Sequence, residues 1–297
     1  METISAQEQG QTIRLRDGRL LGYAEFGDPS GIPLIFCHGW GDSRLTRHPD
    51  DARTAALGIR LITVDRPGFG FSDFQPQRTL LDWPHDVAAL ANALDIDRFA
   101  LLSHSGGGPH ALACAAALSN RLMAVGVACG FAPMDRPNAL EGMSRQMQQG
   151  VRLFSRMPWM ARLLFASLPR QYRRNPEQAF EQQFGHGLPD SDRAVLARPD
   201  VHANVLAGAV EALRSGSRGL AHEAPLFLGQ PWGFRPEAIQ TPVWLWYGDA
   251  DSIVPLQMGH YLANAIPHSD LTIYPGEGHM LHITHWDEIL GTLTRQH

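Results

Sequence analysis

The sequence predicts an α/β fold with a mostly parallel central sheet, helices on both faces of the sheet and a helical insert. Short apolar runs alternate with helical patterns in the first 130 residues, which is typical of strands buried on both faces. The same alternation returns after residue 240. Between these two parts the β-branched runs disappear and helical periodicity takes over, so we expect an insert that interrupts the sheet.

The composition predicts a globular enzyme whose main partner is not nucleic acid. The chain has 297 residues, 44% of them hydrophobic and 19% charged, with a formal net charge of -5. Neither a signal peptide nor an apolar run as long as a membrane span is visible. We expect buried free thiols, a reducing compartment and hence a cytoplasmic protein, because the cysteines lie in apolar or small-residue segments: Cys37, Cys114 and Cys129.

The amino-terminal part begins with a predicted hairpin. Residues 12–15 and 20–26 are two alternating runs around Asp17-Gly18, a pair that favours a tight turn. Alternating strands and helices then follow, as a parallel sheet requires. They are expected as strands over 33–37 and 60–64, a helix over 79–94, a strand over 99–102, a helix over about 106–118 and a strand over 122–128.

The later part of the chain divides into a cap and the remainder of the core. We assign residues 1–133 and 236–297 to an α/β core domain and residues 134–235 to a helical cap. Within the cap, helical periodicity is clearest over 151–164 and 201–214. After it, the pattern predicts a strand over 243–247, a helix over about 255–265, a strand over 271–274 and a last helix from about Trp286.

The most informative segment lies where the predicted strand over 99–102 turns into a helix and reads Ser-His-Ser-Gly-Gly-Gly. A sharp strand-to-helix turn through a serine flanked by small residues is typical of the nucleophile elbow of a hydrolase. Such a turn strains the backbone of its serine, so residues two positions away must be small, and Ser103 and Gly107 are. We predict Ser105 as the nucleophile; a glycine-rich turn without chemistry is the alternative.

A serine hydroxyl becomes a nucleophile only when a base takes its proton, and the base is usually a histidine held by a carboxylate. Both partners follow late predicted strands. We predict His279 as the base, because a histidine in a loop with Gly276 and Gly278 has room to swing its imidazole toward Ser105. Asp249 and Asp251 compete for the acid role. We choose Asp251, which lies a few residues past the strand end, and interpret Asp249 as a turn residue.

Acyl transfer also needs donors for the developing oxyanion. One is expected from the backbone N–H of Gly106, after the nucleophile, and the second from the backbone N–H of Trp40, in the loop after an early strand. The Trp40 ring either lines an acyl pocket or packs against the insert. We interpret His38 as an organiser of this loop, and the segment from residue 65 to 72 as a rigid loop beside the site.

Together these segments resemble the α/β-hydrolases of the proline iminopeptidase, esterase and epoxide-hydrolase type with a helical cap. The resemblance extends from about residue 12 to the last helix, except over the insert. It implies the α/β-hydrolase fold, a Ser105–His279–Asp251 triad and an oxyanion hole, but no substrate. Relatives that use aspartate as nucleophile are excluded by Ser105, and Ser103 departs from the usual glycine. The resemblance is carried by His38-Gly39-Trp40-Gly41, the segment Asp65-Arg66-Pro67-Gly68-Phe69-Gly70-Phe71-Ser72, Ser103-His104-Ser105-Gly106-Gly107, Gly248-Asp249-Ala250-Asp251 with Val254-Pro255, and Gly278-His279.

The cap is expected to set the substrate. Its apolar side chains either face an apolar substrate or pack onto the core, and its arginines are either a solvated face or an attraction for an anionic substrate or carrier. A peptidase of this type would need buried acids to bind a free amino terminus, and spacing identifies no pair. The glutamates available in this region are Glu141, Glu177, Glu181, Glu211 and Glu223.

The predicted function is therefore a serine hydrolase that cleaves a carboxylic ester or lactone, without cofactor or metal, on a small and apolar or ester-containing substrate. Three alternatives stay open. The scaffold could run a transacylase, cyclase or lyase step, act as a proline iminopeptidase-like peptidase, or serve as a catalytically silent ligand receptor. The sequence predicts no oligomeric state.

Overall fold

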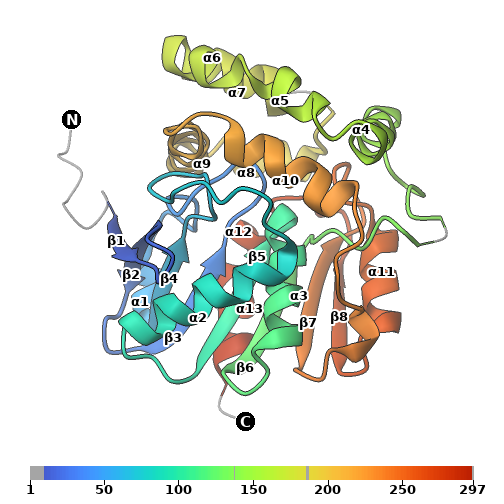
Figure 1. The fold of residues 1–297 in the computed structure, drawn as a ribbon. Coiled ribbons are helices and arrows are strands. Elements are labelled where there is room, and N and C mark those ends of the chain that lie inside the picture. The colour runs from blue at the N-terminus through green and yellow to red at the C-terminus, as the bar shows by residue number, and fades with distance from the viewer. Residues whose placement is uncertain (1–9, 137, 185–186, 296–297) are drawn as a thin grey trace.

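An eight-stranded sheet forms the centre of the molecule (Figure 1). The computed structural model describes residues 10–136, 138–184 and 187–295. The strand order is β1-β2-β4-β3-β5-β6-β7-β8. Strand β2 pairs antiparallel with both β1 and β4, and the five pairs from β4 to β8 are parallel, so the predicted hairpin and the mostly parallel sheet are both confirmed. The strands are β1 (Gln11–Arg14), β2 (Leu20–Gly27), β3 (Ile32–Cys37), β4 (Ile59–Val64), β5 (Phe99–His104), β6 (Leu122–Ala128), β7 (Val243–Gly248) and β8 (Ser269–Tyr274).

Helices cover both faces of the sheet because its strands are apolar on both sides. In β3, Ile35 packs in the cluster that includes α2, α3 and α11, whereas Leu34 and Phe36 pack in the cluster that includes α13. Helix α1 lies on the α13 side, where Trp286 Nε1 donates to the Thr54 hydroxyl over 3.0 Å. The core helices are α1 (Asp51–Ala56), α2 (Trp83–Ala93), α3 (Gly108–Ala117), α11 (Leu256–Ala265), α12 (Leu281–Thr284) and α13 (Trp286–Thr294), with 3-10 turns η1 (Leu80–Asp82), η2 (Ser105–Gly107) and η3 (Pro236–Ala238).

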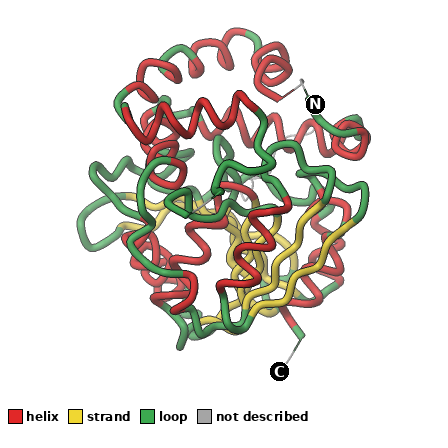
Figure 2. The backbone as a smooth tube through the Cα atoms, turned by 90° about the vertical axis from the view of Figure 1, so that its right-hand side faces the viewer, coloured by secondary structure: helices red, strands yellow, loops and turns green. Residues whose placement is uncertain are grey.

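Among the residues described between β6 and β7, seven α-helices form the predicted helical insert, and they lie over one edge of the sheet (Figures 1 and 2). In Figure 1, α8, α9 and α10 lie next to the core, and α5, α6 and α7 lie farther out. The bounds 134–235 of a separate cap domain stay a prediction. The helices are α4 (Arg145–Arg156), α5 (Met160–Phe165), α6 (Leu168–Arg174), α7 (Pro176–Phe184), α8 (Asp190–Leu196), α9 (Pro199–Ala212) and α10 (Arg218–Leu228).

The helical pattern predicted over 151–164 is divided in the structure. Helix α4 ends at Arg156 and α5 begins at Met160, with Pro158 between them. Proline removes a backbone donor and clashes with the preceding helical turn, which explains the break. Among the described residues, no helix combines the length and the apolar character that a membrane crossing requires.

The parallel strands place their carboxyl ends at the edge beneath the insert. The strand order reverses between β3 and β5, the position at which open α/β sheets usually bind ligands. His38 follows β3 and Ser105 follows β5, so both flank this position. The expectation of free, buried thiols is confirmed for all three cysteines.

Candidate active site

Ser105 lies in a left-handed backbone conformation directly after β5. Its φ is 54°, a region that residues other than glycine rarely occupy and that often marks functional sites. A Cβ on Gly107 would clash with the Cys37 carbonyl oxygen at the end of β3. The turn can therefore pack this closely against β3 only because residue 107 is a glycine. The Ser103 hydroxyl donates to the Gly126 carbonyl over 3.0 Å, which accommodates a serine where the family pattern has glycine.

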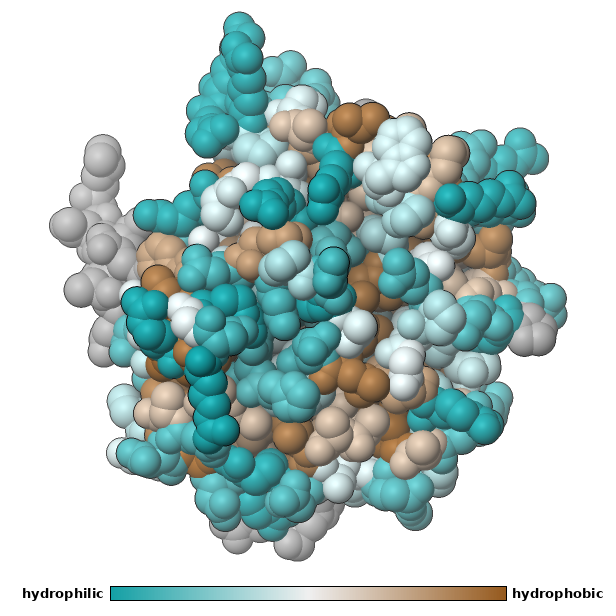
Figure 3. Space-filling view, in the orientation of Figure 1, coloured by the Kyte–Doolittle hydropathy of each residue, from teal (hydrophilic) through white to brown (hydrophobic). Residues whose placement is uncertain are grey.

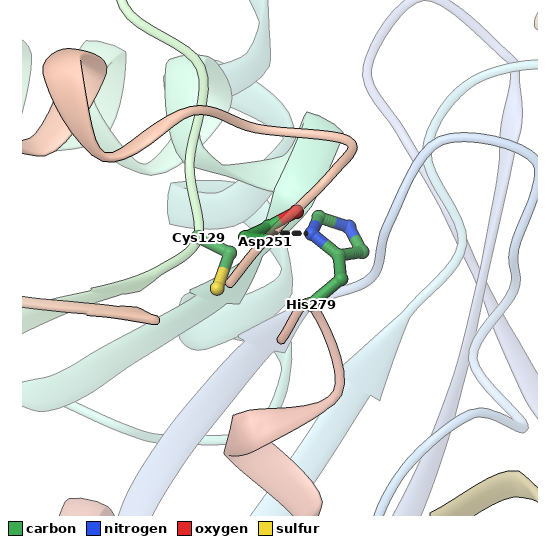
Figure 4. A group of neighbouring side chains, drawn as sticks. All are labelled: Cys129, Asp251 and His279. Atoms are coloured by element: carbon green, nitrogen blue, oxygen red, sulfur yellow. Dashed lines mark hydrogen bonds and ion pairs between the residues drawn. The ribbon is translucent and has the colours of Figure 1, made fainter. Parts of the chain in front are cut away.

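His279 and Asp251 meet at the carboxyl ends of β7 and β8. The His279 Nδ1 atom lies 2.7 Å from Asp251 Oδ2, and both side chains are buried (Figure 4). The other carboxylate oxygen of Asp251 accepts from the backbone N–H groups of Ile253 and Val254 over 2.8 and 2.9 Å. Asp249 instead accepts from the Gly276 N–H over 2.7 Å at an exposed turn. The acid that contacts the histidine is therefore Asp251.

The pKa of His279 reflects two opposing effects. Burial lowers this pKa, but the charge and the hydrogen bond of Asp251 together raise it by more, so it lies above the ordinary value of 6.5. Asp251 thus favours the protonated imidazole, which is the form that a general base takes after it accepts a proton.

His104 connects the elbow to the histidine loop. Its Nε2 atom lies 3.0 Å from the His279 carbonyl oxygen, and its ring stacks on His282 with 3.8 Å between centroids. Burial holds the pKa of His104 well below 6.5, so its ring is neutral. Among the described residues, the Ser105 hydroxyl makes no hydrogen bond to the His279 ring. Such contacts are often long in ligand-free enzymes and shorten when substrate binds.

The loop after β3 lies against the elbow. A Cβ on Gly106 would lie 3.0 Å from the Trp40 backbone nitrogen, and one on Gly39 would lie 3.6 Å from the Ser105 Cβ. The Trp40 ring packs against the insert: Nε1 donates to the Leu220 carbonyl over 3.1 Å, and the ring contacts the ring of Phe165 with 5.4 Å between centroids. The backbone nitrogens of Trp40 and Gly106 are thus neighbours beside Ser105.

A buried ion network fixes this loop to helix α10. The Arg66 guanidinium donates to both carboxylate oxygens of Glu223 over 2.7 and 2.9 Å, and also to the carbonyl oxygens of His38 and Gly39. Arg78 donates to Glu223 over 2.7 Å. Burial raises the pKa of Glu223, but the two arginines lower it by more, so the carboxylate is charged. The segment interpreted from sequence only as a rigid loop therefore supplies an arginine that links the insert to the loop of Trp40.

Asp192 is a second contact that sequence reasoning missed. It belongs to α8, in the insert, and is 1% exposed. Its carboxylate accepts from the backbone N–H groups of His279 and Met280 over 2.9 and 2.8 Å. The segment carrying the histidine is thus held by an aspartate of the insert, and no motif near residue 192 signals this role.

Cys129, Asp251 and His279 form a compact donor group, each offering an atom within 4.8 Å of the others (Figure 4). A metal would need the cysteine as a thiolate. Burial and the neighbouring carboxylate raise the pKa of the Cys129 thiol well above its ordinary value, so the thiol stays protonated. His279 Nδ1 is already bonded to Asp251. We therefore interpret Cys129 as a packing neighbour of the acid–base pair.

The insert glutamates differ in their surroundings. Glu223 is fully buried and bound by two arginines. Glu211 pairs with Arg44 over 2.7 Å, and Glu177 pairs with His202 over 2.8 Å. The glutamate that lies deepest in the insert is therefore already engaged by the protein's own cations.

The sheet order, the insert over its carboxyl edge and the strained serine after β5 define a capped α/β protein of the hydrolase type. The chain belongs to the alpha/beta hydrolase fold family, whose sequence pattern matches residues 32–285. The family predicted from the motifs is confirmed.

Individual relatives agree with this family. The chain is 36% identical over 104 residues to a non-heme chloroperoxidase from Streptomyces lividans, a match that covers 33% of this chain and 36% of the relative. The first curated relatives are each matched over less than two-fifths of their own length. Two solved structures share the fold along nearly the whole chain at 22% identity. A bromoperoxidase from Bacillus anthracis has a TM-score of 0.73, covering 97% of this chain and 100% of that one, and the esterase RhEst1 from Rhodococcus sp. ECU1013 has a TM-score of 0.69, covering 96% and 98%.

Proposed function

We propose that the protein is a serine hydrolase that cleaves a carboxylic ester or lactone through an acyl-enzyme on Ser105. The proposal rests above all on one combination: a serine at φ 54° directly after the central strand β5, and a buried histidine–aspartate pair at the same edge of the sheet. An esterase among the structures of the same fold is in keeping with it.

In the first half-reaction His279 takes the proton of the Ser105 hydroxyl, whose oxygen attacks the carbonyl carbon of the substrate. The Trp40 and Gly106 backbone N–H groups donate to the oxyanion, and Asp251 stabilises the imidazolium. The tetrahedral intermediate then collapses, and His279 returns the proton to the departing alkoxide. For a lactone the released alcohol stays attached to the acyl group.

In the second half-reaction water attacks the ester bond between the acyl group and Ser105. His279 accepts a proton from this water and passes it to the serine oxygen, so free enzyme and a carboxylic acid result. The insert helices above this edge limit the access of bulk water. The substrate is a small molecule whose carbonyl must reach Ser105 beneath them.

Ser105→Ala tests the assignment. The variant should remain folded, since alanine replaces a small side chain, and it should lose turnover of p-nitrophenyl acetate. Retained turnover would contradict the proposal. A variant at Ser119, an exposed serine just after α3, serves as a matched control and should keep full activity.

A second candidate is favoured by the chloroperoxidase and bromoperoxidase similarities. If hydrogen peroxide instead of water attacks the same acyl-enzyme, the products are a peroxy acid and free serine. An assay of peroxy acid with an ester and hydrogen peroxide distinguishes the two outcomes. Transfer to an alcohol acceptor would indicate a transacylase, turnover of amino-acid arylamides would indicate a peptidase, and a serine that reacts with no ester would indicate a receptor.

A further inference from the structure

An apolar face lies on the outer side of the insert, around α5. The exposed fractions of Trp159, Leu163 and Leu164 are 58%, 64% and 49%, and Met157 beside them is 39% exposed. Figure 3 shows hydrophobic and weakly polar groups over α5 at the top of the molecule, with hydrophilic groups on both sides. We call these four residues the cap face. Large apolar side chains that are exposed and lie close together mark an interaction surface.

The surroundings of the cap face are strongly basic. From residue 142 to residue 176 the chain contains seven arginines and no aspartate, glutamate or lysine, a formal charge of +7 in a chain whose net charge is -5. All seven are exposed, and none forms an ion pair with another residue that the structure describes. They are Arg145, Arg152, Arg156, Arg162, Arg170, Arg173 and Arg174.

The cap face is the outer side of a helix that also touches the candidate active site. Ala161 of α5 is fully buried, and the ring of Phe165 contacts the Trp40 ring at 5.4 Å. Trp159 and Arg162 line a pocket with residues of α10. Whatever binds the cap face therefore lies directly outside the helix that covers the loop of Trp40.

We propose that the cap face docks the protein onto the surface of an anionic lipid bilayer. Tryptophan and leucine side chains insert at the boundary between headgroups and acyl chains, and arginines bind lipid phosphates beside them. The charge distribution favours this occupant, because the acidic remainder of the chain is repelled by an anionic surface and only the basic segment is attracted. Docking by this face turns α5 and the underlying site toward the lipid.

Binding is tested by flotation with vesicles of phosphatidylcholine alone and of phosphatidylcholine with phosphatidylglycerol. We expect binding to the anionic vesicles, weaker binding to the neutral ones, and release as salt is raised, because counterions screen the arginines. The inactive Ser105→Ala variant should bind as well as the wild type, so this result does not depend on the proposed function.

Two paired variants locate the binding surface. Arg156→Gln with Arg162→Gln should weaken binding to the anionic vesicles by about fivefold for each arginine removed. Leu163→Asp with Leu164→Asp should abolish it. Matched controls outside the insert, Arg16→Gln with Arg98→Gln and Leu57→Asp, should bind as the wild type does; Leu57 is 37% exposed. Circular dichroism confirms that each variant is folded.

Absence of binding to the anionic vesicles, or equal losses in the cap and control variants, would overturn the inference. Sedimentation velocity tests whether the protein self-associates. Self-association that depends on Leu163 and Leu164, without vesicle binding, would show that a second copy of the chain occupies the cap face instead. The arginine and leucine variants of the cap and their controls should keep their activity on soluble p-nitrophenyl acetate. A second readout, which rests on the proposed function, is faster hydrolysis of a long-chain p-nitrophenyl ester in anionic vesicles by the wild type than by the leucine variant.

Discussion

The carboxylate of Asp192, on a helix of the insert, accepts a 2.9 Å hydrogen bond from the backbone N–H of His279, the candidate general base in the core. The same carboxylate accepts from Met280 over 2.8 Å. The position of the histidine loop therefore depends on the position of the insert, so a displaced insert would also displace the base from Ser105.

Asp192→Ala should lower kcat more than it changes KM for a soluble ester. The substitution leaves two buried N–H groups without acceptors, at a cost of about 1–3 kcal/mol each in stability, and releases the histidine loop. Asp192→Asn keeps one acceptor oxygen and should recover part of kcat. Steady-state kinetics beside urea unfolding separates the two effects. If both variants lose stability but keep the wild-type kcat, Asp192 does not position His279.

Asp251→Asn should move the acid limb of the pH profile of kcat/KM to lower pH. Catalysis requires neutral His279, so activity rises with pH through the histidine pKa, which Asp251 holds above 6.5. Without the Asp251 carboxylate, burial is opposed only by the smaller effect of the Asp192 charge, so the pKa falls. We also expect kcat to decrease by about 10³–10⁴-fold. In the matched control Asp249→Asn, both the limb and kcat should stay as in the wild type; the opposite pattern would assign the acid role to Asp249.

Gly106→Ala should reduce kcat by about 10²–10³-fold, the usual effect of losing one oxyanion donor. A Cβ at this position would lie 2.7 Å from the Trp40 Cβ, so the loop must move away from the elbow. Gly150→Ala, in α4, meets only a ring atom at 3.8 Å and should leave kcat unchanged while raising stability by up to about 1 kcal/mol. If Gly106→Ala and Gly150→Ala have the same kcat, the Trp40 backbone N–H does not contribute to the proposed oxyanion hole.

Glu223→Gln should destabilise the protein by about 3–5 kcal/mol, because Arg66 and Arg78 would lose their buried counter-charge. The free energy of unfolding in urea measures this. Glu237→Gln, which removes the acid of a surface pair with Arg235 at 3.5 Å, is the control and should cost about 1 kcal/mol or less. A small loss at Glu223 would mean that water or a rearranged network replaces the carboxylate.

The strands were predictable because their apolar runs, such as that of β3, are buried on both faces and are separated by crossovers. Helix α1 was not predicted. It has six residues, of which Thr54 alone is buried, so it shows no apolar periodicity. The seven separate insert helices were also not resolved from sequence, since short helices end at positions set by prolines such as Pro158 and by packing on neighbours.

The candidate site likewise contains some residues that the sequence predicted and others that it did not. Ser105, Asp251 and His279 follow strand ends, where local sequence marks the turns. The contacts that tie the insert to the core depend on tertiary packing, and local sequence does not encode it. Glu223 did carry a signal, because a single acid among buried residues of α10 requires a buried cation, and Arg66 meets this need. Asp192 carried none, since its partners are backbone N–H groups about ninety residues later.

The most direct test of the account is the intact mass of the protein after reaction with a fluorophosphonate, which phosphonylates an activated serine and retains the adduct. We predict one adduct on the wild type, assigned to Ser105 by peptide mapping, and none on Ser105→Ala. An unlabelled wild-type protein, or an adduct that persists in Ser105→Ala, would contradict the claim that this serine is the nucleophile.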